Sequence, residues 1–419
     1  MCAQNTIKTK LTRPIIVYLA MMILGIMSGL SDIGYLQSFG IMISDIFIKI
    51  FKFISMPIIA LSIIVTLSNY ENHDGSMTRV WRRTLLYTFG TTIIAAIISC
   101  LLYVVIRPGN VTIGAQQTPS TDFAMQKTTY WQHLSSLIPN NIFSPFLEHQ
   151  VFSVLLLGVL TGIAIRFIPD VDAKNTVKNF FKGIHGIFFV MTRWIILILP
   201  LGVFGFITAT VVQLQNGMNI SGMLEYLIVI VAANLIQGFL ILPTWLSLNQ
   251  IKPFDTMKKM MPALTLAFFS KSSAGTLPVT MSTAETRLNM DPKISRFVLP
   301  LCTSLNMNGC AAFIFATVIF LMQNNGADIT LFTLGSWVII ATIAAIGNAG
   351  VPMGCFFLSA SLLTSMDVPI VLMGIILPFY TVIDMIETSL NVWSDSCVAT
   401  VVAKEDMQFA EASAATVTS

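Results

Sequence analysis

Three acidic residues lie in one long apolar segment near the C-terminus of the chain. The segment, residues 377–403, contains Asp384, Glu387 and Asp395. Helical spacing places four polar side chains on one stripe of a helix: Asp384, Thr388, Asn391 and Asp395. Glu387 lies one position away from this stripe. A carboxylate at membrane depth costs several kcal/mol unless it is paired or faces a polar cavity. The pattern therefore indicates a functional site inside a membrane helix.

The sequence offers these acids no local base, because no lysine or arginine lies between Arg296 and Lys404. Pairing with a base from another helix is the structural alternative, and Lys271 is the best candidate for it. Cations, or a cationic group arriving from outside the protein, are the other natural partners. We therefore expect an ion-coupled carrier.

The composition is that of a polytopic membrane protein. Of the 419 residues, 55% are hydrophobic and only 10% are charged, whereas a soluble domain carries about 25% charged residues. The apolar runs are long and continuous, which predicts helices as the spanning elements. The formal net charge of +3 is small and gives no indication of nucleic-acid binding. Five of the six cysteines lie in apolar stretches and none forms a CxxC pair, so we expect small buried core residues rather than disulfides or metal ligands.

Eight apolar segments are expected to cross the membrane: 14–30, 38–68, 84–106, 151–169, 183–214, 221–247, 297–322 and 369–403. Lysine and arginine cluster in alternate loops, which places both termini in the cytoplasm of a cell-membrane protein. Two further segments, 258–289 and 329–366, are broken by small residues and proline at their middle. Since eight crossings already account for the loop charges, each broken segment must enter and leave on one side, as a re-entrant hairpin. The first enters from the cytoplasm and the second from outside.

The hairpin tips and one interrupted span carry the residues suited to binding. Ser272, Ser273 and Gly275 lie at the first tip, where free N–H groups at a helix start favour an anion, and a tight turn with capping serines is the alternative. The string 306–310 breaks the seventh span, and its exposed carbonyls suit Na⁺; the alternative is hydrogen bonding between helices. Glycines in the second tip, 347–354, indicate a broken helix, with close helix packing as the alternative.

Together these strings resemble the dicarboxylate/amino acid:cation symporter family, the glutamate transporter homologues, over nearly the whole chain. Residues 272–280 (SSAGTLPVT) resemble the serine-rich first hairpin, and Asn306-Met307-Asn308-Gly309 resembles the family string NMDGT. Residues 349–352 (AGVP) resemble the second hairpin tip, and 384–395 resembles the substrate-binding eighth span. Several motifs in the right order carry this resemblance.

The resemblance implies a homotrimer with inverted repeats and an elevator mechanism. A scaffold would comprise 14–68 and 151–214, that is, spans one, two, four and five. A transport domain would comprise 84–106 and 221–404, including both hairpins. Residues 1–13 and 405–419 would form the cytoplasmic N-terminus and tail. The second hairpin would gate the outer side.

The resemblance also assigns residues to ligands. The substrate-binding set would be Ser272, Ser273, Cys310, Val351, Asp384, Glu387, Thr388 and Asn391. Asp384 would hold the substrate α-amino group, and Asn391 with the Ser273 backbone would hold its α-carboxylate. Coupling Na⁺ ions would be ligated by Thr91, Thr92, Cys302, Ser304, Asn306, Asn308, Ala345, Ile346, Asn348, Asn391 and Asp395.

Three departures from the family pattern concern specificity and coupling. Members with acidic substrates carry an arginine where this chain has Glu387. An arginine there would form two hydrogen bonds to the side-chain carboxylate of the substrate. Cys310 replaces the family threonine. Asn308 replaces an aspartate, which weakens the third Na⁺ site by one negative charge.

We therefore predict a Na⁺-coupled symporter, with proton coupling as an alternative, for a neutral or cationic amino acid. A Na⁺- or H⁺-coupled dicarboxylate symporter is the alternative within the carrier class, and an ion channel is the alternative from another class. Without HExxH or GxSxG motifs, the chain is not expected to be an enzyme.

Overall fold

The computed structural model describes residues 17, 20–31, 33–68, 75–111, 141–147, 151–215, 221–346, 348, 350, 353–366 and 368–417. Within these residues every regular element is a helix, as the sequence predicted. The predicted N-terminus 1–13, the start of the first span and Val351 lie outside the described residues.

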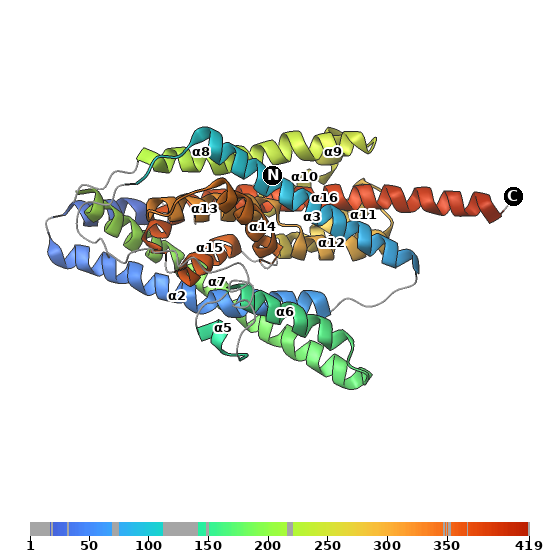
Figure 1. Ribbon diagram of the computed structural model, residues 1–419, viewed down its shortest axis with the longest axis horizontal. Coiled ribbons are helices and arrows are strands. Elements are labelled where there is room, and N and C mark those ends of the chain that lie inside the picture. The colour runs from blue at the N-terminus through green and yellow to red at the C-terminus, as the bar shows by residue number, and fades with distance from the viewer. Residues whose placement is uncertain are drawn as a thin grey trace, which may run out of the picture.

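One group of helices lies along the lower side of Figure 1. It contains α2 (Gly34–Ser68), the short α5 (Ser144–Leu147), α6 (Val151–Arg166) and the long α7 (Val171–Gln215). Helix α2 packs along both α6 and α7. The α2–α7 contact depends on small residues, because a Cβ atom added to Gly205 would lie 2.8 Å from the carbonyl oxygen of Gly40.

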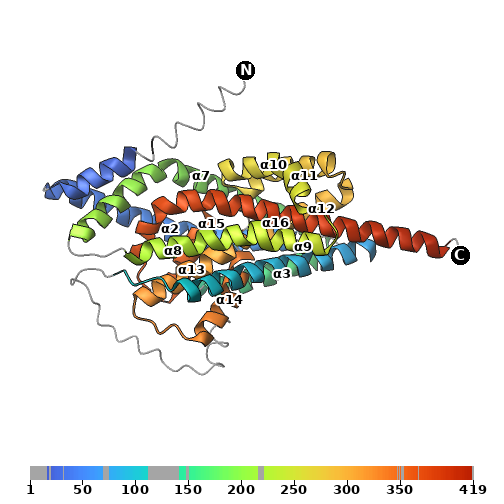
Figure 2. The same cartoon turned by 90° about the horizontal axis from the view of Figure 1, so that it is seen from above.

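A second group surrounds the C-terminal helices. It includes α3 (Gly75–Ile106), which packs against α8 (Ser221–Ile236) in both Figure 1 and Figure 2. Helix α8 continues through one turn of π-helix, η1 (Gln237–Ile241), into α9 (Leu242–Leu248). A π-turn inside a helix often lies at a functional site.

Two helical hairpins and one broken helix occur where the sequence predicts interruptions. Helices α10 (Pro253–Ser270) and α11 (Ser273–Arg287) form the first hairpin, and α14 (Leu331–Ile346) and α15 (Gly354–Ser365) form the second. Helix α12 (Pro292–Leu305) is separated from α13 (Asn308–Asn324) by two non-helical residues. The predicted unwinding within 306–310 is therefore present.

The first hairpin turns because its two tip residues end one helix and begin the next. Lys271 adopts a left-handed conformation, with φ of 54°, and ends α10. The Ser272 hydroxyl then accepts a hydrogen bond from the Gly275 N–H at 3.0 Å and caps α11. The capping-serine alternative is thus correct for the Ser272 side chain.

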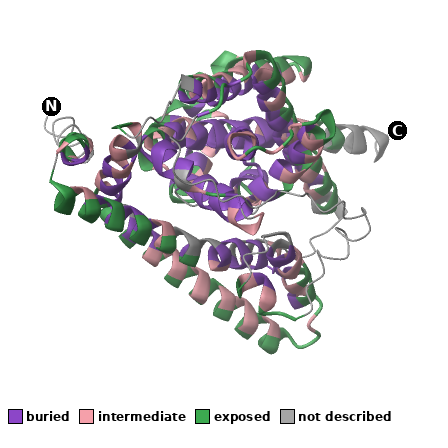
Figure 3. Ribbon diagram, turned by 60° about the vertical axis from the view of Figure 1, so that its left-hand side comes forward, coloured by how far each residue is buried: buried purple, intermediate pink, exposed green. Residues whose placement is uncertain are grey.

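The centre of the molecule is formed by α13 and α16 (Val371–Val417). Every residue of α13 from Asn308 to Met322 is buried. Buried ribbon is concentrated in the centre of the larger helical group in Figure 3. Helix α16 continues to residue 417, so the described part of the predicted tail 405–419 extends the eighth span as helix.

Four helices in the described part are long and apolar enough to cross a membrane: Thr78–Ile106, Gly222–Leu248, Pro292–Asn324 and Leu372–Phe409. A bent pair, Val171–Thr192 with Leu197–Val212, is a fifth if it forms one span. Shorter apolar helices lie within the remaining predicted spans, including Ala20–Leu30, Met56–Val65 and Leu156–Arg166. The protein is polytopic, and the number of eight crossings remains a prediction.

Candidate functional site

A small cavity of about 10 Å³ lies where both hairpins meet α13 and α16. Six of the predicted substrate residues line it: Ser273, Cys310, Asp384, Glu387, Thr388 and Asn391. Four residues complete its wall, namely Lys271, Asn348, Gly350 and Cys355. The structure therefore brings together side chains that are up to 120 positions apart in the sequence, from Lys271 to Asn391.

A larger cavity, of about 380 Å³, lies between α10, α16 and the π-helix. Its wall consists mainly of apolar side chains and contains no charged residue among those described. Size alone favours this cavity, but binding an ion or an amino acid requires convergent polar groups. The small polar cavity is the candidate functional site for that reason.

The tips of the two hairpins touch at this site. The Ser272 hydroxyl donates a hydrogen bond to the Gly350 carbonyl oxygen at 3.4 Å. Gly350 has a φ of +67°, and a Cβ atom there would lie 3.2 Å from the backbone nitrogen of Ala274. Only glycine adopts this conformation without strain while allowing such a close approach. The second tip therefore needs a glycine at this position.

Two acids of α16 face the cavity with incomplete hydrogen bonding. Asp384 and Glu387 are 4% and 1% exposed. Tyr380 donates a hydrogen bond to Oε2 of Glu387 at 3.3 Å, whereas Oε1 of Glu387 and Oδ2 of Asp384 have no partner. Lys271 lines the same cavity, as the alternative of pairing with a base had anticipated. Buried polar atoms without partners are costly, so these oxygens are available to a ligand.

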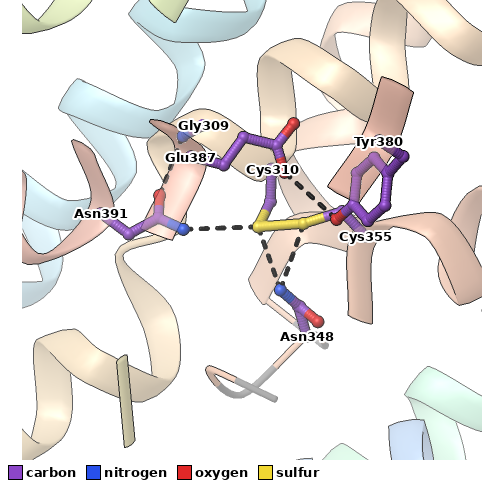
Figure 4. Close-up of a disulfide and its surroundings, with 7 residues drawn as sticks. All are labelled: Gly309, Cys310, Asn348, Cys355, Tyr380, Glu387 and Asn391. Atoms are coloured by element: carbon purple, nitrogen blue, oxygen red, sulfur yellow. Dashed lines mark hydrogen bonds between the residues drawn. A yellow bond between two sulfur atoms is a disulfide. The ribbon is translucent and has the colours of Figure 1, made fainter. Parts of the chain in front are cut away.

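The cysteine prediction is wrong for one pair. Cys310, at the start of α13, and Cys355, at the start of α15, form a disulfide beside Glu387 (Figure 4). The amide nitrogen Nδ2 of Asn348 donates to both sulfur atoms, at 3.0 Å and 3.3 Å. This pair could not be predicted from the sequence, because the two residues are 45 positions apart and lie on different elements.

Asn391 connects α16 to the break before α13. Its Oδ1 accepts the Gly309 N–H at 2.9 Å, and its Nδ2 approaches the Cys310 sulfur at 3.5 Å. Figure 4 shows this amide between the helix start and the disulfide. A backbone donor left over at the break is therefore satisfied by a side chain that also faces the cavity.

A second polar cluster surrounds the break between α12 and α13. The Asn306 Nδ2 donates to Asp395 Oδ1 at 3.1 Å, and the Thr303 hydroxyl donates to Asp395 Oδ2 at 3.2 Å. The Thr91 hydroxyl donates to Asn306 Oδ1 at 2.9 Å. Hard cations prefer oxygen ligands, and this cluster combines a buried carboxylate, an amide oxygen and a hydroxyl. Its donor set fits Na⁺.

Asn308 belongs to the same network through a residue that the sequence analysis missed. Gln237, in the π-helix, donates from Nε2 to Asn308 Oδ1 at 2.6 Å, and Asn308 Nδ2 donates to Asn306 Oδ1 at 2.8 Å. Both residues are almost fully buried. A glutamine within the apolar run 221–247 was the available signal, since polar residues inside membrane helices are often functional.

Some predicted Na⁺ ligands are not joined to this cluster by the hydrogen bonds described. Thr92 is buried and its hydroxyl has no partner. The Ser304 hydroxyl donates to the Pro300 carbonyl within its own helix. Ala345 and Ile346 end α14. Cys302 is the exception, since its carbonyl oxygen accepts the Asn306 N–H at 2.7 Å. Their role as ligands stays a prediction.

Comparisons with known proteins identify the family of this chain. Residues 15–405 match the model of the sodium:dicarboxylate symporter family. A putative sodium-dependent excitatory amino acid transporter of Caenorhabditis elegans is 26% identical over 85% of this chain and 81% of its own length. The proton/sodium-glutamate symport protein of Geobacillus stearothermophilus is 26% identical, over 93% and 94% of the two chains.

Neutral amino acid transporter B(0) of Oryctolagus cuniculus is also similar, at 22% identity over 84% of this chain and 71% of its own length. The matched segment includes both hairpins, the break before α13 and the acids of α16. The resemblance inferred from the motifs is thus confirmed, and the protein is a transporter rather than an enzyme. This chain belongs to the sodium:dicarboxylate symporter family.

Proposed function

We propose that this protein couples Na⁺ entry to the uptake of an amino acid whose side chain is neutral or cationic. The observation that carries the proposal is the buried Glu387, which faces the small cavity with one oxygen unpartnered. An acidic side chain in the substrate would meet a carboxylate there instead of an arginine. A neutral or cationic side chain can donate a hydrogen bond to that oxygen.

The charge balance of the cavity supports this choice. With all three groups ionised, Lys271, Asp384 and Glu387 contribute +1, −1 and −1, which sum to −1. A zwitterionic amino acid leaves that sum unchanged and one with a cationic side chain brings it to zero. Aspartate or glutamate would bring it to −2, which is unfavourable in a buried site.

The backbone and the polar cluster supply the remaining parts of the proposed site. In the proposal, Asp384 holds the substrate α-amino group, while Asn391 and the N–H groups at the start of α11 hold the α-carboxylate. Asn306, Asp395 and Thr91 take part in Na⁺ binding. Since Asn391 contacts the start of α13, Na⁺ and substrate act on one connected structure, and each raises the affinity of the other.

A dicarboxylate symporter is the second candidate, because relatives include a glutamate symport protein and Lys271 lies in the same cavity as Glu387. We extend the proposal, from family membership, to a homotrimer in the cell membrane with both termini cytoplasmic. The group of α2, α6 and α7 acts as scaffold, and the hairpins with α3, α8, α12, α13 and α16 move as a transport domain.

The test is a thermal stability screen of the purified protein against neutral, basic and acidic amino acids and C4-dicarboxylates, in Na⁺ and in choline. A ligand at 100 times its Kd stabilises the folded protein by about 2.7 kcal/mol, which is a measurable shift. A Na⁺-dependent shift with a neutral or basic amino acid supports the proposal. A shift with aspartate, glutamate or a dicarboxylate alone favours the second candidate, and Na⁺ flux without saturable substrate uptake indicates a channel.

The pocket assignment predicts that Asp384→Ala and Asn391→Ala abolish uptake while the protein still assembles. Asp384→Asn is a milder variant that removes only the charge. Thr400→Ala is a matched control, because Thr400 lies further along α16 and its hydroxyl bonds to Ser396 in its own helix. Proteoliposome uptake and native mass are the measurements. Normal uptake by either pocket variant would contradict the assignment.

A further inference from the structure

The disulfide between Cys310 and Cys355 joins the two sides of the cavity that must separate if a ligand enters past the second hairpin. Cys355 is the second residue of α15, directly after the hairpin tip, and Cys310 lies in the first turn of α13. Their Cα atoms are 5.4 Å apart, within the usual range for a disulfide. Both side chains are nearly fully buried.

The cavity in this state is too small for an amino acid. At about 10 Å³ it holds roughly one water-sized sphere. Its wall comes from four elements, and the second hairpin contributes Asn348, Gly350 and Cys355. A substrate that approaches from this side therefore requires the hairpin tip to move away from α13, and a covalent bond between Cys355 and Cys310 opposes that movement.

We infer that Cys310 and Cys355 are a redox modification site, whose disulfide locks the second hairpin over the substrate pocket and whose dithiol form allows the pocket to open. This inference rests on the proposed function for its effect on uptake. A metal site formed by the two cysteines and Glu387 is the competing idea. The sulfur atoms are bonded to each other in the structure, which leaves no pair of thiolates to ligate a metal.

The chemistry is thiol–disulfide exchange with a small external disulfide, RSSR. One protein thiolate attacks RSSR, forms a mixed disulfide and releases one RSH after protonation. The second protein thiolate then attacks the protein sulfur of the mixed disulfide and releases the second RSH. The protein pair loses two electrons and RSSR gains them. A dithiol reductant reverses both steps.

These two cysteines differ from the other described ones in lying against each other. Asn348 and Asn391 provide amide donors to the sulfur atoms, which stabilise a thiolate. Cys100, Cys302 and Cys397 lie on other helices and are free. Because the pair lies in the pocket wall, Na⁺ with a bound substrate is expected to shield the reduced thiols from RSSR.

The experiment uses the full-length protein in proteoliposomes, treated with 2-hydroxyethyl disulfide or with dithiothreitol. Alkylation under denaturing conditions, followed by peptide mass mapping, measures the fraction of the protein that carries the Cys310–Cys355 bond. We expect oxidised protein to take up the amino acid identified in the stability screen at least about tenfold more slowly than reduced protein, since opening of such a lid limits turnover. Dithiothreitol should restore the rate.

Variants separate the pair from other thiols. Cys355→Ser should give the same uptake in oxidant and reductant, and Cys355→Ala serves if the serine variant does not fold. Cys100→Ser is the matched control and should respond as the unsubstituted protein does. If the disulfide forms and uptake of the oxidised protein stays within about twofold of the reduced protein, the inference is overturned. It is also overturned if oxidant fails to form the bond.

A readout that does not need transport keeps the two proposals apart. Hydrogen exchange of the backbone amides in residues 354–365 should be slower in oxidised than in reduced protein, because the tether suppresses local opening. If no amino acid is taken up in either state, the proposed function fails, and this exchange difference still tests the tether. Equal exchange in the two states overturns the lock.

Discussion

Glu387 is oriented by a tyrosine that packs between two phenylalanine side chains. Its single described donor is Tyr380, whose ring packs against Phe313 and Phe356 at centroid distances of 4.6 Å and 5.3 Å. An aromatic side chain packed on two sides has little rotational freedom. Tyr380 therefore positions Oε2, and Oε1 is left without a hydrogen-bond partner at the cavity. This arrangement supports the proposal that Glu387 contributes to substrate specificity.

Glu387→Arg should shift preference towards aspartate and glutamate. A guanidinium at this position can pair with a substrate carboxylate, and such charge-assisted bonds contribute about 1.5–3 kcal/mol, which is roughly a ten- to hundredfold gain in affinity. Glu387→Gln is the control, because it removes the charge at nearly constant shape. Ligand-induced thermal shifts in Na⁺ measure both. No gain of acidic amino acid binding in the arginine variant would leave this role of Glu387 unsupported.

Asn308→Asp should raise the apparent affinity for Na⁺. The substitution adds one negative charge beside Asn306 and Thr91, and a cation within about 4 Å of a new charge is favoured by several kcal/mol at an effective dielectric constant near 20. Gln237 can still donate to the new carboxylate. The Na⁺ dependence of uptake and of thermal stability are the measurements.

Asn324→Asp is the matched control for that variant, because the same substitution at the far end of α13 lies outside the polar cluster. An unchanged Na⁺ dependence in Asn308→Asp, or an equal change in the control, would argue against a cation near Asn308.

Residues of the pocket could be predicted where the signal lies in their own segment of the sequence. Acids in an apolar helix and serines at a hairpin tip are visible in the sequence, and the structure brings Ser273, Asp384 and Glu387 together. Cys355 and Gln237 were missed because their importance arises from neighbours on other elements. A cysteine in a helix shows no partner until α15 is packed against α13.

At the scale of the elements, the interruptions of the helices contribute more to the candidate site than the regular helices do. The sequence predicted the two hairpin turns and the break before α13 correctly, because glycine, serine, asparagine and proline disfavour helix at known positions. The bend within α7 and the π-turn after α8 were not predicted. Helix ends were less predictable. Helix α7 begins at residue 171 rather than 183, and α16 ends at 417 rather than 403. A search for apolar runs finds only the part of a helix at membrane depth. It does not detect polar extensions at either end of the helix.

Gly350→Ala should weaken the contact between the hairpin tips. The residue has a φ of +67°, and an added Cβ would lie 3.1 Å from the Thr303 carbonyl oxygen and 3.3 Å from Ser273 Cβ. A non-glycine residue in this conformation costs on the order of 1–3 kcal/mol, and here the neighbours are backbone or buried. We expect substrate affinity to fall by about tenfold or more while the protein stays folded.

Gly335→Ala is the control for this variant, because a Cβ there meets no atom within 4 Å. Binding by thermal shift and folding by circular dichroism are the measurements. If Gly350→Ala binds substrate as the unsubstituted protein does, the meeting of the tips does not shape the pocket.

At the scale of the whole molecule, the two groups of helices touch where α15 packs against α2 and where α16 packs against α7. Helix α16 packs against α7, where a Cβ added to Gly374 would meet the ring of Phe206. Helices α3, α8, α13 and α16 contact one another, the first hairpin packs against α16 and the second packs against α13. A division into a scaffold and a mobile body is the proposal that follows from family membership.

Cross-linking across this boundary should stop transport without stopping binding. We expect Phe206→Cys with Gly374→Cys, joined by a short bifunctional thiol reagent, to reduce uptake to below about a tenth, because a sliding step cannot be completed. The control pair is Ser99→Cys with Ala312→Cys, which lies inside the proposed mobile body, where the Ser99 hydroxyl donates to the Ala312 carbonyl at 2.8 Å. The control pair should keep its uptake, since the two helices move together.

Each singly substituted protein is treated with the same reagent as a further control. Any loss of uptake in these proteins is due to reaction at the native cysteines or at a single introduced cysteine. Thermal shift by substrate in Na⁺ reports binding in the cross-linked protein. Normal uptake by the linked Phe206/Gly374 pair would mean that α7 and α16 stay in contact throughout the cycle, which excludes sliding at this boundary. Equal inhibition in the control pair would mean that the helices of the proposed mobile body also move past one another, which a single rigid body does not do.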